Sequence, residues 1–155
     1  MGSQNMQYSI NDLAPLISDC VNSGKKVKMR VTGTSMYPLL RDRTDVVVLE
    51  SFDKLRKYDI VLHRRTNGKY IMHRIIKTDG DVLTIAGDFE TEKEYPVYTQ
   101  QVLARVTGFW RDDNYYSCKG LFFRVYSFLW VVFFPHRHKI LRFLHAVRRK
   151  LHVRK

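Results

Sequence analysis

Short apolar runs separated by turn-forming residues fill most of the first 110 positions of the chain. Alternating or wholly apolar runs of this length are typical of β-strands. The pattern predicts strands at residues 26–31, 45–50, 58–64, 69–77, 82–86 and 101–110. Many short strands joined by tight turns favour a mainly β fold built as an antiparallel, partly closed β-barrel.

The residue types between these strands predict the turns. Asn67-Gly68 predicts a two-residue type I′ hairpin turn, because both central positions of that turn need a positive φ. Gly87-Asp88 predicts a further turn, and the acid-rich stretch 89–95 is predicted to be a loop.

Helical periodicity marks one short segment before the strands and two after them. The first has Asn11 or Asp12 as its predicted N-cap, and its apolar face carries Leu13, Leu16, Ile17, Cys20 and Val21. Residues 121–134 form an apolar run of 14 residues. As a helix this run would reach about 21 Å, less than the roughly 30 Å hydrocarbon core of a membrane. An amphipathic pattern follows Pro135.

The length of 155 residues fits one folded domain. We interpret residues 1–5 as a cloning remnant before Met6, residues 6–25 as an N-terminal helix and residues 26–110 as the β domain. Residues 115–155 are then a C-terminal amphipathic, membrane-associating helical segment.

The net charge of +12 is concentrated in the tail, because residues 135–155 contain eight Lys and Arg residues and no acid. A basic amphipathic helix beside an aromatic run favours contact with an anionic membrane surface over contact with nucleic acid. The expected membrane-binding residues are Phe122, Phe123, Trp130, Arg142, Arg148 and Arg149. Peripheral attachment at the cytoplasmic face is expected, since no export signal is visible. Docking on a partner protein, or a buried core helix at residues 121–134, are the alternatives.

Ser35 is the candidate nucleophile, because it lies in a turn bracketed by Gly33 and Pro38, where its own backbone N–H could stabilise an oxyanion. On the return strand, His73 projects between Ile71 and Ile75. Loss of solvation there would disfavour its charged form, which suits a general base. The alternatives are a turn serine and a structural histidine.

The remaining histidines and the cysteines show no pattern of a metal or redox site. His63 precedes Arg64 and Arg65 and is expected to lie on the solvated surface. Cys20 and Cys118 are far apart, and no ligand spacing joins the tail histidines. No metal and no cofactor are therefore expected.

Four segments together resemble the signal peptidase family, whose serine peptidases share a β fold with the self-cleaving repressor peptidases. The segments are Gly33-Thr34-Ser35-Met36-Tyr37-Pro38-Leu39, Tyr58-Asp59-Ile60-Val61, Tyr70-Ile71-Met72-His73-Arg74-Ile75-Ile76 and Gly87-Asp88. They occur in the family's order, and histidine followed by arginine is the pattern of the archaeal and endoplasmic-reticulum members. Tyr58 replaces a family glycine.

The resemblance implies that Ser35 attacks the scissile carbonyl and that His73 acts as general base. The oxyanion would be bound by the backbone N–H of Ser35, with Thr34 or Thr32 replacing a hydroxyl that some relatives carry at the position of Gly33. Asp88 or Glu94 would orient the histidine, or the site would be a Ser/His dyad.

The sequence thus predicts a serine endopeptidase that cleaves a signal or leader peptide, or a preprotein, after small residues. One alternative is a self-cleaving regulatory peptidase of the repressor type, although those relatives use lysine at the position of His73. The other is a non-catalytic membrane-bound adaptor on a degenerate peptidase fold.

Overall fold

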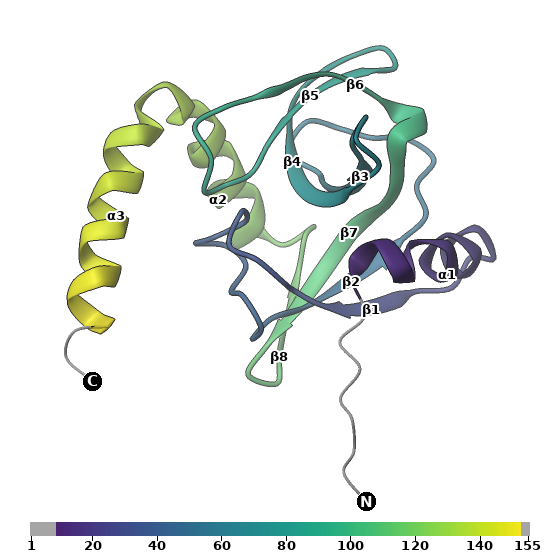
Figure 1. Cartoon of the computed structure of the whole chain (residues 1–155), viewed down its shortest axis with the longest axis horizontal. Helices are drawn as coiled ribbons and strands as arrows, with labels where there is room; N and C mark the ends of the chain where they lie inside the picture. The colour runs from purple at the N-terminus through teal and green to yellow at the C-terminus, as the bar shows by residue number, and fades with distance from the viewer. Residues whose placement is uncertain (1–8, 153–155) are drawn as a thin grey trace, which may run out of the picture.

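A computed structural model describes residues 9–152 as a curled antiparallel sheet with one helix before it and two after it (Figure 1). The strands are β1 Val27–Arg30, β2 Val46–Glu50, β3 Ile60–Arg64, β4 Tyr70–Asp79, β5 Val82–Ala86, β6 Glu94–Tyr98, β7 Val102–Arg111 and β8 Asn114–Ser117. The α-helices are α1 Ile10–Asn22, α2 Leu121–Val132 and α3 Arg137–His152. The predicted mainly β class with flanking helices is confirmed.

The sheet does not close into a barrel, because its strand order β1-β2-β7-β3-β4-β5-β6 leaves β1 and β6 as edges. The long strand β7 joins the two halves: it pairs with β2 through residues 105–110 and with β3 through residues 102–105. β8 pairs with the last residues of β7. Strong curling around β3 and β4 brings non-adjacent strands together (Figure 1).

The hairpin between β3 and β4 differs from the predicted two-residue turn. Gly68 has a positive φ of 81°, whereas Asn67 does not. The N–H of Arg65 donates to the carbonyl of Lys69 at 2.8 Å, which leaves residues 66–68 as a three-residue loop. A left-handed glycine at the end of a three-residue hairpin loop is a common solution. The register places His63 opposite Ile71, and Val61 opposite His73.

The N-cap and the buried face of α1 differ from the predicted ones. Ser9 is the N-cap, and the side chain of Asp12, at the third helical position, completes a capping box. Neither Asn11 nor Asp12 is the cap. Leu16 is 62% exposed, because the face of α1 that packs on the sheet carries Ala14, Ile17 and Val21.

Two strands were missed by the sequence patterns. The acid-rich stretch ends in β6, whose sequence Glu-Tyr-Pro-Val-Tyr contains a proline and only one buried residue, Val97. β8 consists of polar and aromatic residues that pack beside β7. Neither segment has the apolar run that the other strands have, so pairing in three dimensions decides its conformation.

The apolar core lies on both faces of β3 and β4. Ile60, Leu62 and Met72 join the larger cluster, under α1 and the serine turn. Val61 and Ile75 face the opposite side and pack with Leu83, Ile85 and Val97 of the curled β5 and β6. His63 and His73 share this second face. His73 pairs with Val61, and His63 lies two positions along β3 from Val61.

The C-terminal helices bury only part of their surface. α2 buries Phe123, Ser127 and Val131 and exposes Phe122, Val125, Phe128 and Leu129. Phe123 and Trp130 were expected at a membrane; instead Phe123 is 5% exposed, and the indole N–H of Trp130 donates to the backbone of the protein. Phe122 is exposed, as are other apolar side chains of α2. The side chain of Arg148 lies outside the described part of the chain.

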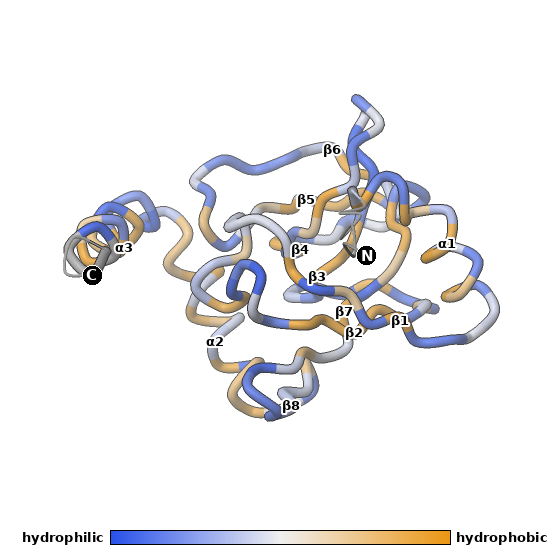
Figure 2. Tube along the Cα trace, turned by 60° about the horizontal axis from the view of Figure 1, so that its bottom comes forward, coloured by the Kyte–Doolittle hydropathy of each residue, from blue (hydrophilic) through white to orange (hydrophobic). Residues whose placement is uncertain are grey.

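α3 extends away from the sheet, with apolar and basic residues on different sides (Figure 2). Leu141 and Arg137 are buried near its start, whereas Arg142 and Arg149 are exposed. Among the described residues, neither helix combines the length and hydropathy required for a membrane span.

Candidate active site

Ser35 lies in the turn between β1 and β2, where the sequence analysis placed it. The side chain of Asp42 accepts a hydrogen bond from the N–H of Gly33 at 2.8 Å and so fixes the start of this turn. Ser35 is half-buried. In the part of the chain that the structure describes, neither its hydroxyl nor its backbone N–H forms a hydrogen bond. Both groups are therefore free to meet a substrate.

Gly87 connects the serine turn to the acid-rich loop. The N–H of Phe89 donates to the carbonyl of Ser35 at 2.8 Å. A Cβ on Gly87 would lie 2.6 Å from this carbonyl oxygen and 3.0 Å from Cδ of Glu90. Only a residue without a side chain allows so close an approach. The turn at residues 87–88 thus holds Ser35 and Glu90 side by side.

His73 is fully buried on β4 and is bracketed by two carboxylates. Its Nδ1 lies 2.9 Å from Oε1 of Glu94, and its Nε2 lies 3.4 Å from Oε1 of Glu90. These are ion-pair distances, and neither ring nitrogen forms a hydrogen bond.

The two ends of the imidazole therefore face different elements. Nδ1 points to Glu94 at the start of β6, and Nε2 points to Glu90, beside the serine turn. This polarity is the one that a serine peptidase requires, since the acid binds one ring nitrogen and the serine the other.

The neighbouring carboxylates favour the protonated form of His73, although its burial opposes a charge. Burial alone lowers the pKa of His73, but Glu90 and Glu94 outweigh it and hold this pKa above its usual value of 6.5. The lowered pKa expected from the apolar flanks is therefore wrong. Burial likewise opposes the charge of Glu94, but His73 and Arg65 depress the pKa of Glu94.

Arg65 supports Glu94 from the opposite side. Its Nε lies 2.9 Å from Oε2 of Glu94, and its Nη2 contacts Oε1. Such a bidentate pair fixes the orientation of a carboxylate. Glu90 and Glu94 are thus half-buried in contact with His73, whereas Glu92 is exposed.

His63 was expected on the surface, but it is fully buried. It lies beside His73, with ring centroids 5.8 Å apart, and its Nε2 is 3.5 Å from Oε2 of Glu94. Burial lowers the pKa of His63 to about 4. The observed three-residue hairpin loop places it two positions from the partner of His73, whereas the predicted two-residue turn would have placed it opposite Met72, on the other face.

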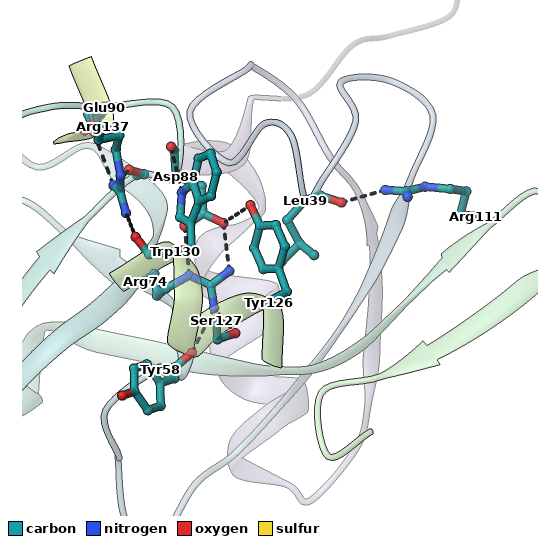
Figure 3. A network of polar contacts seen from close by, with 11 residues as sticks. Leu39, Tyr58, Arg74, Asp88, Glu90, Arg111, Tyr126, Ser127, Trp130 and Arg137 are labelled. Atoms are coloured by element: carbon teal, nitrogen blue, oxygen red, sulfur yellow. Dashed lines mark hydrogen bonds and ion pairs between the residues drawn. The ribbon is translucent and has the colours of Figure 1, made fainter. Parts of the chain in front are cut away.

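Asp88, the other candidate for orienting His73, binds a different residue. Its two carboxylate oxygens accept from Nε and Nη2 of Arg74 at 2.8 and 2.7 Å, and both side chains are fully buried (Figure 3). The described contacts of Asp88 do not include His73. Arg74, next to His73 in sequence, points to the other face of β4, and this alternation explains the pairing.

The Arg74–Asp88 pair is enclosed by α2. Arg74 also donates to the hydroxyl of Ser127 at 2.6 Å, and Tyr126 donates to Asp88 at 3.2 Å. Trp130 donates to the carbonyl of Asp88 at 3.0 Å, and Arg137 donates to the carbonyl of Gly87 at 2.9 Å (Figure 3). These contacts fix the Gly87–Asp88 turn, which contacts Ser35 and leads into Glu90.

Two cavities differ in their suitability for catalysis. A cavity of about 80 Å³ adjoins Ser35, Met36, Gly33 and Ile71. A larger groove of about 900 Å³ lies along α2 and contains Cys118 and Phe128, but none of the candidate catalytic residues. Burial raises the pKa of Cys118 to about 12, so its thiol is a poor nucleophile near neutral pH. The smaller cavity contains the candidate nucleophile Ser35, but not His73, Glu90 or Glu94.

An open antiparallel sheet that brings a free serine turn beside a buried histidine and its carboxylates is the fold of a serine peptidase of the signal-peptidase and repressor-peptidase type. The family model described as Peptidase S24-like matches residues 1–102, and the chain belongs to this family. A comparison with curated protein sequences gave no match.

Proposed function

We propose that the protein is a serine endopeptidase with Ser35 as nucleophile, His73 as general base and Glu94 as the acid that positions His73. The contact between Nδ1 of His73 and Glu94 carries the proposal, because it directs Nε2 toward the turn that holds Ser35. Catalytic hydrogen bonds are often formed only once substrate binds, so the free hydroxyl of Ser35 fits a resting enzyme.

The geometry supports a conventional acyl-transfer sequence. With a proton on Nδ1 facing Glu94, Nε2 of His73 has a lone pair that can take the proton of Ser35 as its Oγ attacks the scissile carbonyl. The free N–H of Ser35 would bind the oxyanion, and the hydroxyl of Thr34, half-buried in the same turn, is a second candidate donor. His73 then protonates the leaving amine, and water releases the acyl group.

A small side chain at the cleavage site is supported by the cavity beside Ser35. Its volume of about 80 Å³ equals that of two or three waters at roughly 30 Å³ each. A side chain such as alanine would fit, whereas an aromatic ring would not. We therefore propose that the substrate is a signal or leader peptide, or a preprotein, cleaved after a small residue.

Peripheral attachment to a membrane is the second half of the proposal. Four exposed apolar residues of α2, Phe122, Val125, Phe128 and Leu129, lie near the exposed bases Arg124 and Lys119. Apolar contact and basic charge together give interfacial binding. Flotation with anionic vesicles should decrease in Phe128→Ser but not in Tyr98→Ser, which removes an exposed aromatic residue from β6. Equal flotation of both variants would refute this attachment.

A serine-directed fluorophosphonate probe tests the catalytic proposal. Mass spectrometry should locate the probe on Ser35, with labelling lost in Ser35→Ala and in His73→Ala and kept in Ser51→Ala, which changes an exposed loop serine. Unlabelled Ser35 in the folded protein would instead favour the non-catalytic adaptor.

The family match also favours a second candidate, a self-cleaving peptidase of the repressor type, because members of this family include repressors. This candidate predicts two fragments when the chain is incubated alone, at a rate independent of protein concentration. An intact chain that cleaves added peptide would exclude it.

A further inference from the structure

His63, His73 and Glu94 form a compact ligand set inside the curled end of the sheet. Each offers one ligand atom, and the three atoms lie within 4.8 Å of one another. The residues come from β3, β4 and β6, so the set exists only in the folded protein. Its closest contacts are those of Glu94, which lies 2.9 Å from Nδ1 of His73 and 3.5 Å from Nε2 of His63.

The ring nitrogens of both histidines lack hydrogen-bond partners and could coordinate a metal ion. Both rings are fully buried, and none of their four nitrogens forms a hydrogen bond. Buried polar atoms without partners are rare and costly, and they often mark the position of a missing water or ion. The rings lie side by side, with centroids 5.8 Å apart and planes tilted by 43°.

The geometry is close to that of a transition-metal site. Zn²⁺ binds histidine nitrogen and carboxylate oxygen at about 2.0–2.2 Å, which places neighbouring ligand atoms roughly 3–3.5 Å apart. The contacts of Glu94 already lie near this spacing, at 2.9 Å from Oε1 to His73 and 3.5 Å from Oε2 to His63, and all three ligand atoms lie within 4.8 Å of one another. Two histidines and one carboxylate, with a fourth position open to water, suit Zn²⁺ better than the oxygen-seeking Ca²⁺ or Mg²⁺.

We propose that His63, His73 and Glu94 bind a divalent transition-metal ion of the Zn²⁺ type, and that this ion inhibits the enzyme. The inhibitory part rests on the function proposed above. A metal on Nδ1 of His73 occupies that lone pair, so the ring proton must move to Nε2. A protonated Nε2 cannot accept the proton of Ser35. The same ion also takes the carboxylate of Glu94 from its positioning role.

Arg65 opposes binding of the ion. Its guanidinium holds both oxygens of Glu94, and its positive charge repels a cation at the same carboxylate. Metal binding therefore requires Arg65 to share or release Glu94. Removing this charge should tighten binding, which is a gain that damage to the fold would not produce.

The experiment is calorimetric titration of the metal-free full chain with Zn²⁺, paired with the visible spectrum of its Co²⁺ form. We expect one buried site, with affinity at least tenfold weaker in His63→Asn and severalfold stronger in Arg65→Gln. His136→Asn removes an exposed histidine and should bind like the parent. Binding that is unchanged in His63→Asn, or lost in His136→Asn, would overturn the site. So would unchanged or weaker binding in Arg65→Gln.

Probe labelling of Ser35 in the presence of Zn²⁺, and again after a chelator, tests the inhibitory role. Labelling should be blocked by Zn²⁺ in the parent, restored by the chelator, and less sensitive to Zn²⁺ in His63→Asn. Continued labelling of the Zn²⁺-loaded parent would refute inhibition. Absence of labelling without metal would instead refute the peptidase function, and the titration would still decide the metal site.

Discussion

Glu94 contacts His73 across a strand: they lie on β6 and β4, which β5 separates, and yet Oε1 and Nδ1 are 2.9 Å apart. In a flat sheet, two strands separated by a third lie nearly 10 Å apart. Curling of β4–β6 around the second apolar cluster closes this distance. The side chain of Glu94 spans the remainder.

Replacing Glu94 by glutamine should reduce catalysis while leaving the fold intact. The neutral amide no longer favours Nδ1–H or the imidazolium that forms during attack, so kcat should fall by about 10²- to 10⁴-fold. Steady-state hydrolysis of a leader-derived peptide measures the effect. Glu92→Gln, in the same loop but exposed, is the matched control. A kcat that is equal in both variants would show that Glu94 has no positioning role.

Activity should depend on pH through the raised pKa of His73. General-base catalysis needs the neutral imidazole, so kcat/KM should rise with pH and level off only above the ordinary histidine pKa of 6.5. Glu90→Gln removes one of the two carboxylates that stabilise the charged ring, so the acidic limb should move to lower pH. An acidic limb unmoved by this substitution would show that Glu90 does not face the base in solution.

Adding a single methyl group at Gly87 should displace the serine turn. A Cβ there would lie 2.6 Å from the carbonyl oxygen of Ser35, a distance that forces the backbone to move. Probe labelling of Ser35 in Gly87→Ala should fall by at least tenfold. Gly120→Ala places its Cβ 3.1 Å from the carbonyl of Ser117, remote from the turn in sequence, and should label normally.

The Arg74–Asp88 pair should contribute strongly to stability when one partner is removed. Arg74→Met leaves Asp88 buried without its counter-ion, which typically costs about 3–5 kcal/mol of the unfolding free energy. Urea denaturation followed by circular dichroism measures this loss. Lys26→Met, which breaks an exposed pair with Glu50, should have little effect. The double variant Arg74→Met/Asp88→Asn should recover part of the stability; a further loss would argue against an uncompensated charge as the cause.

The two buried histidines should give stability opposite pH slopes. The pKa of His63 is lowered to about 4, so it adds stability above pH 6.5 that is lost as the pH falls from about 6.5 to 4. The pKa of His73 is raised, so its contribution is complete below 6.5 and is lost as the pH rises through its folded-state pKa. Thermal unfolding across this range should show the slope below pH 6.5 flattened in His63→Gln and retained in the exposed control His136→Asn.

Much of the site followed from local pattern. Gly33 and Pro38 marked the turn, and period two on β4 separated His73 from Arg74. The resemblance then supplied the roles. These features depend on neighbours in sequence, which is why they could be predicted without coordinates.

The contacts that the sequence could not give are those between distant strands. The choice between Asp88 and Glu94 depended on how far the sheet curls, and the burial of His63 depended on β6 covering it. Strand β6 was not predicted because a charged residue such as Glu94 is typical of a loop. Its partners His73 and Arg65 are distant in sequence. The pKa of His73 was misjudged for the same reason.

Trp130, Tyr126 and Arg137 hold the Gly87–Asp88 turn from beyond residue 102, where the family match ends. A shortened protein that kept β7 and β8 but ended before α2 would uncover the Arg74–Asp88 pair to water and release the Gly87–Asp88 turn, to which Ser35 is bonded through Phe89. The smallest fragment that keeps Ser35 in place should therefore include the first C-terminal helix and Arg137, which follows it. Any ligand that pulls this helix outward would act on the nucleophile from a distance.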